Sequence, residues 1–542
     1  MANISSPRLY LSQSRYIAGL VGMFALLSLG LVCLGALANF GLSWALLSDM
    51  WHDPYLSHVL VTTIKQALLS VFFASLIGSI GALAFHRRDR FRFRSWLLLA
   101  CFSAMIMPTT VAALGLLKLW GQSGLIAQTP FIHLIPDRLG LWSVILAHTF
   151  FNAPLVMRVC LTALDTMPLS QRRQAALLSL SPWRYFTVMD WPILRSVLPS
   201  VMGLVFLLCF TSFSLVLMLG GGPAVTTLEV SIYTSLRFDF DLPKAAFLSF
   251  LQLAICALLL RLFGQGKSSP TALHRPHHQG VPRADARFPL IKLADGFIIC
   301  AIIILNILPL ALLVIQSDML AGLPLFAEMR LWRAFYHSIT LAIGASLLAL
   351  SVAFLLGFLA HECRLRGQKT LLSLIDVSHS LFLLVPALVL GTALFILLRQ
   401  IIDVTAYGFW ILLLGNGLLA LPFCYRIITP ALLQHLTETD PLCEMLNLSG
   451  WHRFRQIILP SLRQEIGFAL GLSAALSFGD LGIITLFGSQ SFETLPYMLF
   501  HFLNRYGADE ADLLAFLLLV TAIGLYLFFT KMVALWGRAI AR

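Results

Sequence analysis

The chain has 542 residues, of which 59% are hydrophobic and only 11% are charged, far below the roughly 25% charged residues of an average soluble protein. This composition excludes an ordinary soluble or disordered protein and indicates a chain largely embedded in lipid. The formal net charge of +12 would suggest an anionic partner such as DNA in a soluble protein. In a membrane protein it marks orientation instead, so we expect membrane lipid and no nucleic acid as a partner.

The nine cysteines predict neither a disulfide framework nor a zinc site, because they are odd in number and never form a CxxC pair. No clustered acid, base or metal-ligand residues are apparent either. The sequence therefore predicts no metal, no cofactor and no catalytic residues.

Twelve apolar runs are long enough to cross the hydrocarbon core, which takes roughly 20 residues of helix. They are residues 17–42, 60–85, 96–120, 139–157, 197–219, 245–263, 297–315, 339–359, 371–398, 409–425, 466–487 and 513–529. The first run is too long for the apolar part of a signal peptide, and we interpret it as an uncleaved span. If the N-terminus is cytoplasmic, most Lys and Arg residues fall on the cytoplasmic side, as the positive-inside rule requires.

A polar stretch rich in Pro, His, Gly and Arg, residues 264–289, separates two six-span halves and is typical of a linker. Each half has a histidine after its second span (His86, His361), followed by basic residues. Each half also has an early proline in its third span (Pro108, Pro386). We predict a parallel duplication within an all-α polytopic membrane protein of about twelve transmembrane helices. The expected parts are a tail and first span (1–55), a first transmembrane domain (56–263), a linker (264–292), a seventh span with an outer loop (293–335), and a second transmembrane domain (336–536).

Two loops that face the same side repeat one pattern. Residues 173–192 read RQAALLSLSPWRYFTVMDWP and residues 441–460 read PLCEMLNLSGWHRFRQIILP. Aligned without a gap, they share two leucines, a serine, Trp183 with Trp451, Phe186 with Phe454, and Pro192 with Pro460. A shared pattern on one side of the membrane indicates that both loops dock to the same kind of partner. The alternative for either loop alone is an ordinary amphipathic helix at the membrane interface.

This spacing resembles the EAA motif of binding-protein-dependent (type I) ABC import permeases, which reads Glu-Ala-Ala, three residues, Gly, nine residues, Ile-x-Leu-Pro. The second copy keeps the tail, whereas Ser179 and Asn447 replace the glycine and neither copy keeps the Glu-Ala-Ala. Asn tolerates left-handed backbone geometry, so a turn at Asn447 is compatible with the motif. The resemblance implies two tandem six-span permease units whose loops couple to ATPase subunits. The implied coupling residues are Gln174, Ala175, Ala176, Ser179, Trp183, Pro192, Glu444, Asn447, Gly450, Trp451, Ile457, Leu459 and Pro460.

Three further stretches are similar to the thiamine (thiamine pyrophosphate) permeases of Gram-negative bacteria. They are HTFFNAPLVMRVCLTALDTMP, LLCFTSFSLVLMLGGGPAVTTLEVSIYTSLRFDFD and SFGDLGIITLFGSQSFETLPYMLF. Iron(III) permeases of the same superfamily share the two-half organisation and a similar glycine-rich outer loop. An iron(III) or polyamine permease therefore remains the alternative.

The resemblance implies a multi-pass protein of the bacterial inner membrane with both termini in the cytoplasm. Its implied partners are two cytoplasmic ABC ATPase subunits, a periplasmic substrate-binding protein and a small-molecule substrate. The chain itself is not expected to be an enzyme. Its one phosphate-loop lookalike, Gly266-Lys267-Ser268, lacks the required earlier glycine, since position 261 is Arg261.

Polar groups are costly inside a membrane, so they are the first candidates for a translocation path. Asp480 could balance the cationic thiazolium of thiamine. It could instead cap a helix break at Gly479 or pair with another intramembrane charge such as Lys65. Asp376 is a second candidate, although local polar packing is the alternative. Phe213 and Phe478 could stack on an aromatic ring, whereas packing is the usual role of phenylalanine in a membrane helix.

A secondary transporter of the major-facilitator type is the main rival, because it also has twelve spans and a central loop. That family expects a glycine-bearing Asp-Arg-x-Gly-Arg-Arg signature after its second span. Here Asp89-Arg90 stand without the glycine. The paired loop motif also favours the ABC permease.

Overall fold

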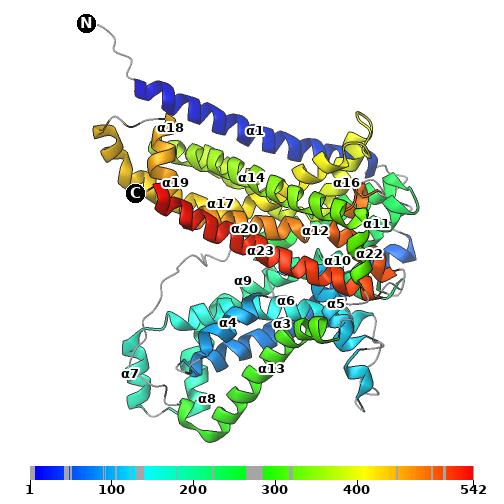
Figure 1. Cartoon of the computed structure of the whole chain (residues 1–542). Helices are drawn as coiled ribbons and strands as arrows, with labels where there is room; N and C mark the ends of the chain where they lie inside the picture. The colour runs from blue at the N-terminus through cyan, green and yellow to red at the C-terminus, as the bar shows by residue number, and fades with distance from the viewer. Residues whose placement is uncertain are drawn as a thin grey trace. The chain divides into compact units, whose positions relative to one another are not determined.

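In the computed structural model the described residues form helices joined by turns and irregular segments, and no strand occurs among them. These are residues 7–41, 48, 50, 52–89, 91, 93–103, 107–121, 124–129, 140–178, 180–222, 225–263, 283, 285–316, 322–446, 448, 450–489, 492–504 and 508–540. The expected all-α membrane architecture is confirmed (Figure 1).

In the described part of the chain, nine helices are long and apolar enough to span a membrane. They are Tyr16–Gly41, Pro54–Arg87, Leu141–Asp165, Pro182–Phe210, Leu242–Arg261, Pro289–Ile315, Met329–Leu365, Gly408–Cys443 and Glu510–Met532. The other three expected spans are broken or short. Residues 96–120 form α4 (Arg94–Ser103) and α5 (Thr109–Trp120), residues 371–398 form α15 (Lys369–Leu384) and α16 (Ala387–Leu398), and residues 466–487 form α20 (Arg463–Phe478) and α21 (Ile484–Phe487).

Proline stands at two of these breaks. Pro108 and Pro386 lie directly before α5 and α16. Proline disfavours helical geometry at the residue before it, so α15 ends at Leu384, before the extended Val385. α4 already ends at Ser103, and residues 104–106 lie outside the described residues. The bend between α15 and α16 is 99°.

The chain forms two compact units that are not consecutive segments. Unit 1 contains residues 1–50, 232–253 and 318–542, and unit 2 contains residues 51–231 and 254–317. In unit 1, α1 (Pro7–Gly41) packs along α14 (Met329–Leu365) (Figure 1). In unit 2, α13 (Pro289–Ile315) packs on α3 (Pro54–Arg87), α4 and α5. The first helix of each half therefore belongs to the unit built mainly from the other half.

Both halves use nearly the same order of elements. After the long helix and the broken third span, the first half continues with α6 (Leu141–Asp165), α7 (Leu169–Leu177), α8 (Pro182–Tyr185), η4 (Phe186–Asp190), α9 (Trp191–Phe210), α10 (Ser214–Leu219), α11 (Leu228–Arg237) and α12 (Leu242–Phe263). The second half continues with α17 (Gly408–Met445), α18 (Gly450–Arg453), η8 (Phe454–Ile458), α19 (Leu459–Ser461), α20, α21, α22 (Leu495–Asn504) and α23 (Ala508–Ile540). Two differences are that α17 extends over the positions of α7, and that α19 and α20 together match α9. Short turns η2 (Ile126–Gln128), η6 (Asp285–Arg287) and η7 (Leu323–Ala327) complete the set.

One hydrogen bond is repeated at matching positions. The Leu228 backbone N–H donates to Thr63 Oγ1 at 3.0 Å in unit 2. In unit 1 the Leu495 N–H donates to Ser338 Oγ at 2.8 Å. Each leucine follows a threonine in the sequence, as Thr227-Leu228 and Thr494-Leu495. The matching contact therefore supports the predicted duplication.

Small residues let the central helices of each unit approach closely. This is usual in membranes, where the hydrophobic effect does not drive helices together and close packing is needed instead. A Cβ on Gly78 of α3 would lie 2.6 Å from the Ala153 carbonyl oxygen of α6. In unit 1, a Cβ on Gly467 of α20 would lie 3.0 Å from the Phe529 carbonyl oxygen of α23. These helix pairs form the cores from which the two repeated loops extend.

Candidate functional site

The first repeated loop is a short helix, a turn and a π-helical entry into the next span. After α7, Pro182 stands at the first position of α8, where its missing N–H costs nothing. The Trp191 N–H bonds to the Phe186 carbonyl, five residues earlier, which makes η4 a π turn. Pro192 follows and has no N–H to continue the ordinary ladder. Single π turns are frequent at functional sites.

The second loop also has a short helix followed by a π turn, but the turn before its short helix is different. Gly450 begins α18 with φ +61°, a left-handed geometry that favours glycine. The Leu459 N–H bonds to the Phe454 carbonyl, so η8 is also a π turn, and Pro460 follows. The shared Phe and Pro positions of the sequence pattern thus mark the same backbone feature twice. Ser179 and Asn447, where the sequence suggested the turn, lie outside the described residues.

Each loop exposes apolar side chains at matching positions. Docking surface 1 is Leu177, Leu178 and Trp183, and docking surface 2 is Met445, Leu446 and Trp451. All six side chains are exposed, with Trp183 at 72% and Trp451 at 67%. On soluble proteins, contiguous exposed apolar patches are typical of interaction sites, so these six residues are the candidate docking positions.

The remaining predicted loop residues differ in burial. Gln174 is exposed and Ala175 is buried, whereas Pro192, Gly450, Ile457, Leu459 and Pro460 are half-buried. Ala176 lies in α7 and Glu444 in α17. Among the predicted residues whose side chains the structure describes, the two tryptophans and Gln174 are the exposed ones.

A histidine and an aspartate tie the helices at the base of each loop. In unit 2, His86 Nδ1 lies 2.9 Å from Asp165 Oδ1, and Arg172 Nη2 donates to His86 Nε2 at 3.0 Å. Because a guanidinium has no acceptor, Nε2 must accept and Nδ1–H must donate to Asp165, which makes His86 neutral. In unit 1, His361 Nε2 lies 2.9 Å from Asp440 Oδ2, and Arg453 pairs with the same carboxylate.

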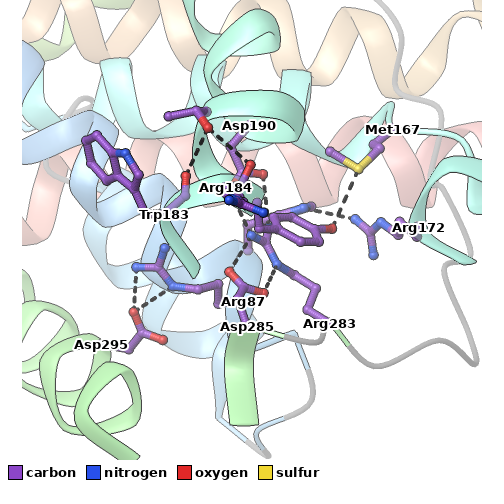
Figure 2. Close-up of polar contacts among 12 residues, drawn as sticks. Arg87, Met167, Arg172, Trp183, Arg184, Asp190, Arg283, Asp285 and Asp295 are labelled. Carbon is purple, nitrogen blue, oxygen red and sulfur yellow. Dashed lines mark hydrogen bonds and ion pairs between the residues drawn. The ribbon is translucent and has the colours of Figure 1, made fainter. Parts of the chain in front are cut away.

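A buried ion cluster that the sequence patterns did not reveal closes the first loop (Figure 2). Arg283, at the end of the linker, donates to Asp190 of η4 at 3.2 and 2.7 Å and to Asp285 at 3.0 and 2.8 Å. Its guanidinium carbon also lies 4.3 Å from the centre of the Tyr185 ring. Burial alone would lower the pKa of Arg283, but the two carboxylates outweigh burial and raise it, so the side chain stays cationic. The only sequence signal was the run of opposite charges in Arg283-Ala-Asp285-Ala-Arg287.

The four path candidates are distributed over both units. Phe478 and Asp480 lie at the break between α20 and α21 in unit 1. Asp480 accepts hydrogen bonds from the Gly482 and Ile483 N–H groups at 3.0 and 3.3 Å, which is the capping role considered as its alternative. Phe478 is buried, while Asp376 is exposed on α15 of the same unit. Phe213 is buried in unit 2, before α10.

A duplicated set of membrane helices with two matching apolar loops is the architecture of a binding-protein-dependent import permease. Residues 58–265 match the family described as "Binding-protein-dependent transport system inner membrane component". The predicted class of protein is confirmed.

Relatives that are similar to nearly the whole chain identify the family within this class of permeases. The chain is 34% identical over 493 residues to "Thiamine transport system permease protein ThiP" of Escherichia coli (strain K12), covering 90% of this chain and 91% of that protein. The protein of the same name from Brucella melitensis is 36% identical over 481 residues, 87% of each chain. The Haemophilus influenzae protein is 32% identical over 496 residues, 90% of this chain and 91% of that one. The chain therefore belongs to the family of thiamine transport system permease proteins.

Family membership settles the general role. The protein is a multi-pass component of the inner membrane that works with a substrate-binding protein and with ATPase subunits. It is a transport component rather than an enzyme.

Proposed function

We propose that this chain forms the translocation path for thiamine or thiamine pyrophosphate, delivered by a periplasmic binding protein. The substrate is supported by the names of the relatives that match almost the full length. The coupling to ATP is supported chiefly by the two docking surfaces, each built on a π turn between matching Phe and Pro residues.

Two docking surfaces imply two ATPase subunits, one on each loop. Closure of the ATPase pair would push on both loops. The first loop continues through its π turn into α9, and the second continues through its π turn and α19 into α20. Movement of the loops would thereby open the path alternately to the two sides. The excess of Lys and Arg on the loop side supports cytoplasmic N- and C-termini.

Asp480 is our proposed counter-charge for the thiazolium ring of the substrate. Its carboxylate stands at a break between two helices, where a membrane protein can expose polar groups to a path. Phe478, Phe213 and Asp376 are proposed as further path residues. Their aromatic or acidic side chains suit an aromatic cation.

The test is uptake by the complete transporter, with ATPase subunits and binding protein, in proteoliposomes. Labelled thiamine should accumulate only when ATP reaches the ATPase, and unlabelled thiamine pyrophosphate should compete whereas ferric iron and spermidine should not. Uptake by the chain alone, driven by a proton gradient, would overturn the proposal in favour of a secondary transporter.

Docking is tested separately with Leu178→Glu and Leu446→Glu, which place charge on exposed positions of the two surfaces. Each should lower ATPase retention and thiamine uptake while the chain still reaches the membrane. Arg333→Glu, at an exposed position of α14 outside both loops, is the control. Full retention and uptake in both loop variants would show that the ATPase binds elsewhere.

The role of Asp480 is tested with Asp480→Asn, since Asn keeps an oxygen acceptor for the Gly482 N–H but loses the charge. Uptake should fall about tenfold or more while the ATPase activity without binding protein is retained. Asp403→Asn is the matched control, because Asp403 also accepts a backbone N–H, from Thr405 at 2.9 Å, but is exposed in a connecting loop. Unchanged uptake with Asp480→Asn would leave Asp480 with its capping role alone.

A further inference from the structure

The end of the linker, residues 283 and 285–288, is held on one side by the first docking loop. Arg283 is 6% exposed and bonds to both oxygens of Asp190, which is completely buried in η4. The Tyr185 ring of α8 lies against the same guanidinium. The linker end thus contacts both the helix that carries Trp183 and the π turn that follows it (Figure 2).

The other side of the linker end is bonded to the membrane helices of unit 2. Arg88, just after α3, donates to the Ala286 carbonyl at 2.9 Å and to Asp295 of α13 at 3.0 Å. Arg87 adds two hydrogen bonds to Asp295, at 2.9 and 2.7 Å. A continuous chain of ionic and polar contacts therefore runs from the docking loop through the linker end to α3 and α13.

These contacts do not tolerate loss of the central cation. Asp190 and Asp285 are both buried, and a buried carboxylate without a partner is strongly unfavourable. Arg283 is the cation that satisfies both. Removal of the Arg283 side chain should therefore release the linker end and shift η4, because the two unpaired carboxylates are more stable when they are hydrated.

Among the described residues, the second loop is held by contacts within unit 1. Ile458 occupies the position that matches Asp190, and Arg453 occupies the position that matches Tyr185. Arg453 pairs with Asp440 in α17 of the same unit, next to His361. The corresponding support thus comes from within the loop and its own helix.

We propose that the linker end is a working part of the first ATPase-docking loop and that Arg283 is its positioning residue. Arg283 holds the helix of Trp183 in the orientation that the ATPase recognises and connects that helix to α3 and α13. The second docking loop does not depend on it. This inference rests on the proposed docking function of the two loops.

The experiment uses the complete transporter with the photo-crosslinking residue p-benzoyl-phenylalanine at position 178 or 446. In the unmodified background both positions should crosslink to the ATPase. With Arg283→Ala, crosslinking from position 178 should fall at least about fivefold, the lower end of ordinary coupling energies, while crosslinking from position 446 stays the same. Stimulation of ATPase activity by the loaded binding protein should fall with it. Lys292→Ala, an exposed cation in α13, is the matched control and should change neither signal.

A charge exchange keeps the test decisive if Arg283→Ala fails to fold. Asp190→Arg combined with Arg283→Asp restores the ion pair in reverse, and it should recover crosslinking from position 178 relative to Asp190→Arg alone.

Loss of both crosslinks in the unmodified background would refute the docking assignment itself. Normal crosslinking from both positions in Arg283→Ala, or equal loss from both, would overturn the role of Arg283 while leaving the docking assignment intact.

Discussion

His361 and Asp440 make in one unit the contact that His86 and Asp165 make in the other. The nitrogen–oxygen distance is 2.9 Å in both pairs, and both are separated by 79 residues along the chain. Each pair joins the end of a long helix, α3 or α14, to the helix that leads into a docking loop. The base of each loop is thus fixed by a His–Asp contact, made through Nδ1 of His86 in one unit and through Nε2 of His361 in the other.

Loss of this contact should destabilise the unit that contains it. For His86→Ala we expect the free energy of unfolding to fall by about 1–3 kcal/mol, because Asp165 and Arg172 lose their shared buried partner. The measurement is thermal unfolding of the purified chain in detergent. His58→Ala, at an exposed position of α3, is the control and should stay within about 0.5 kcal/mol of the parent. Equal stability of the two variants would contradict a structural role for the His86 contact.

The tryptophans of the docking surfaces should contribute to ATPase binding without contributing to folding. Trp183→Ala or Trp451→Ala should each weaken ATPase binding by about 2 kcal/mol, as expected for an interface hot spot, with little change in the unfolding temperature. Binding of the ATPase to the permease in nanodiscs measures the effect. Trp410→Ala, exposed at the start of α17 and outside the loops, serves for comparison. If Trp410→Ala weakens binding as much as the loop variants do, the docking surfaces are wrongly assigned.

The sequence predicted the parts of this structure that have a local or repeated pattern. Apolar runs located the spans, and the matched Phe186, Pro192, Phe454 and Pro460 located both loops. Pro108 and Pro386 lay where the third span of each half breaks. Proline acts on its nearest neighbours, so its effect can be inferred from a short segment.

The contacts between distant segments could not be predicted in the same way. Arg283 and Asp190 are 93 residues apart, and no periodicity relates them. The expectation of a polar linker extended to residue 292, whereas the described linker end is partly buried against the first loop. An ion pair between distant segments depends on the final packing of unit 2, which no local pattern in the sequence determines.

Close helix packing in unit 2 leads to a prediction about a glycine. A methyl group on Gly78 would lie 2.6 Å from the Ala153 carbonyl oxygen and 2.7 Å from Val156 Cβ, so α3 and α6 would have to separate. Gly78→Ala should therefore destabilise the protein by about 1–3 kcal/mol, measured by the unfolding temperature in detergent. Gly524→Ala in α23, where the new methyl meets nothing within 4 Å, should be neutral or stabilising by up to about 1 kcal/mol, because alanine favours helix more than glycine. The reverse order of these two variants would show that α3 and α6 do not pack as described.

Arg330 and Glu493 should hold the loop before α22 in place. Arg330, in the first turn of α14, donates to both carboxylate oxygens of Glu493 at 2.7 Å, and His337 Nδ1 lies 3.3 Å from the Glu493 carbonyl oxygen. Glu493 is 7% exposed, so Arg330→Ala leaves a largely buried carboxylate without its guanidinium. Because hydrogen bonds to charged groups contribute about 1.5–3 kcal/mol each, this variant should lower the unfolding temperature clearly and speed proteolysis within residues 492–495. Arg330→Lys should recover only part of the loss, since an ammonium cannot reproduce the two parallel bonds.

Arg333→Ala is the control for this prediction, because Arg333 is exposed one turn away on the same helix, and it should behave like the parent. A proteolysis rate in Arg330→Ala equal to that of Arg333→Ala would mean that the Arg330–Glu493 pair does not restrain the loop.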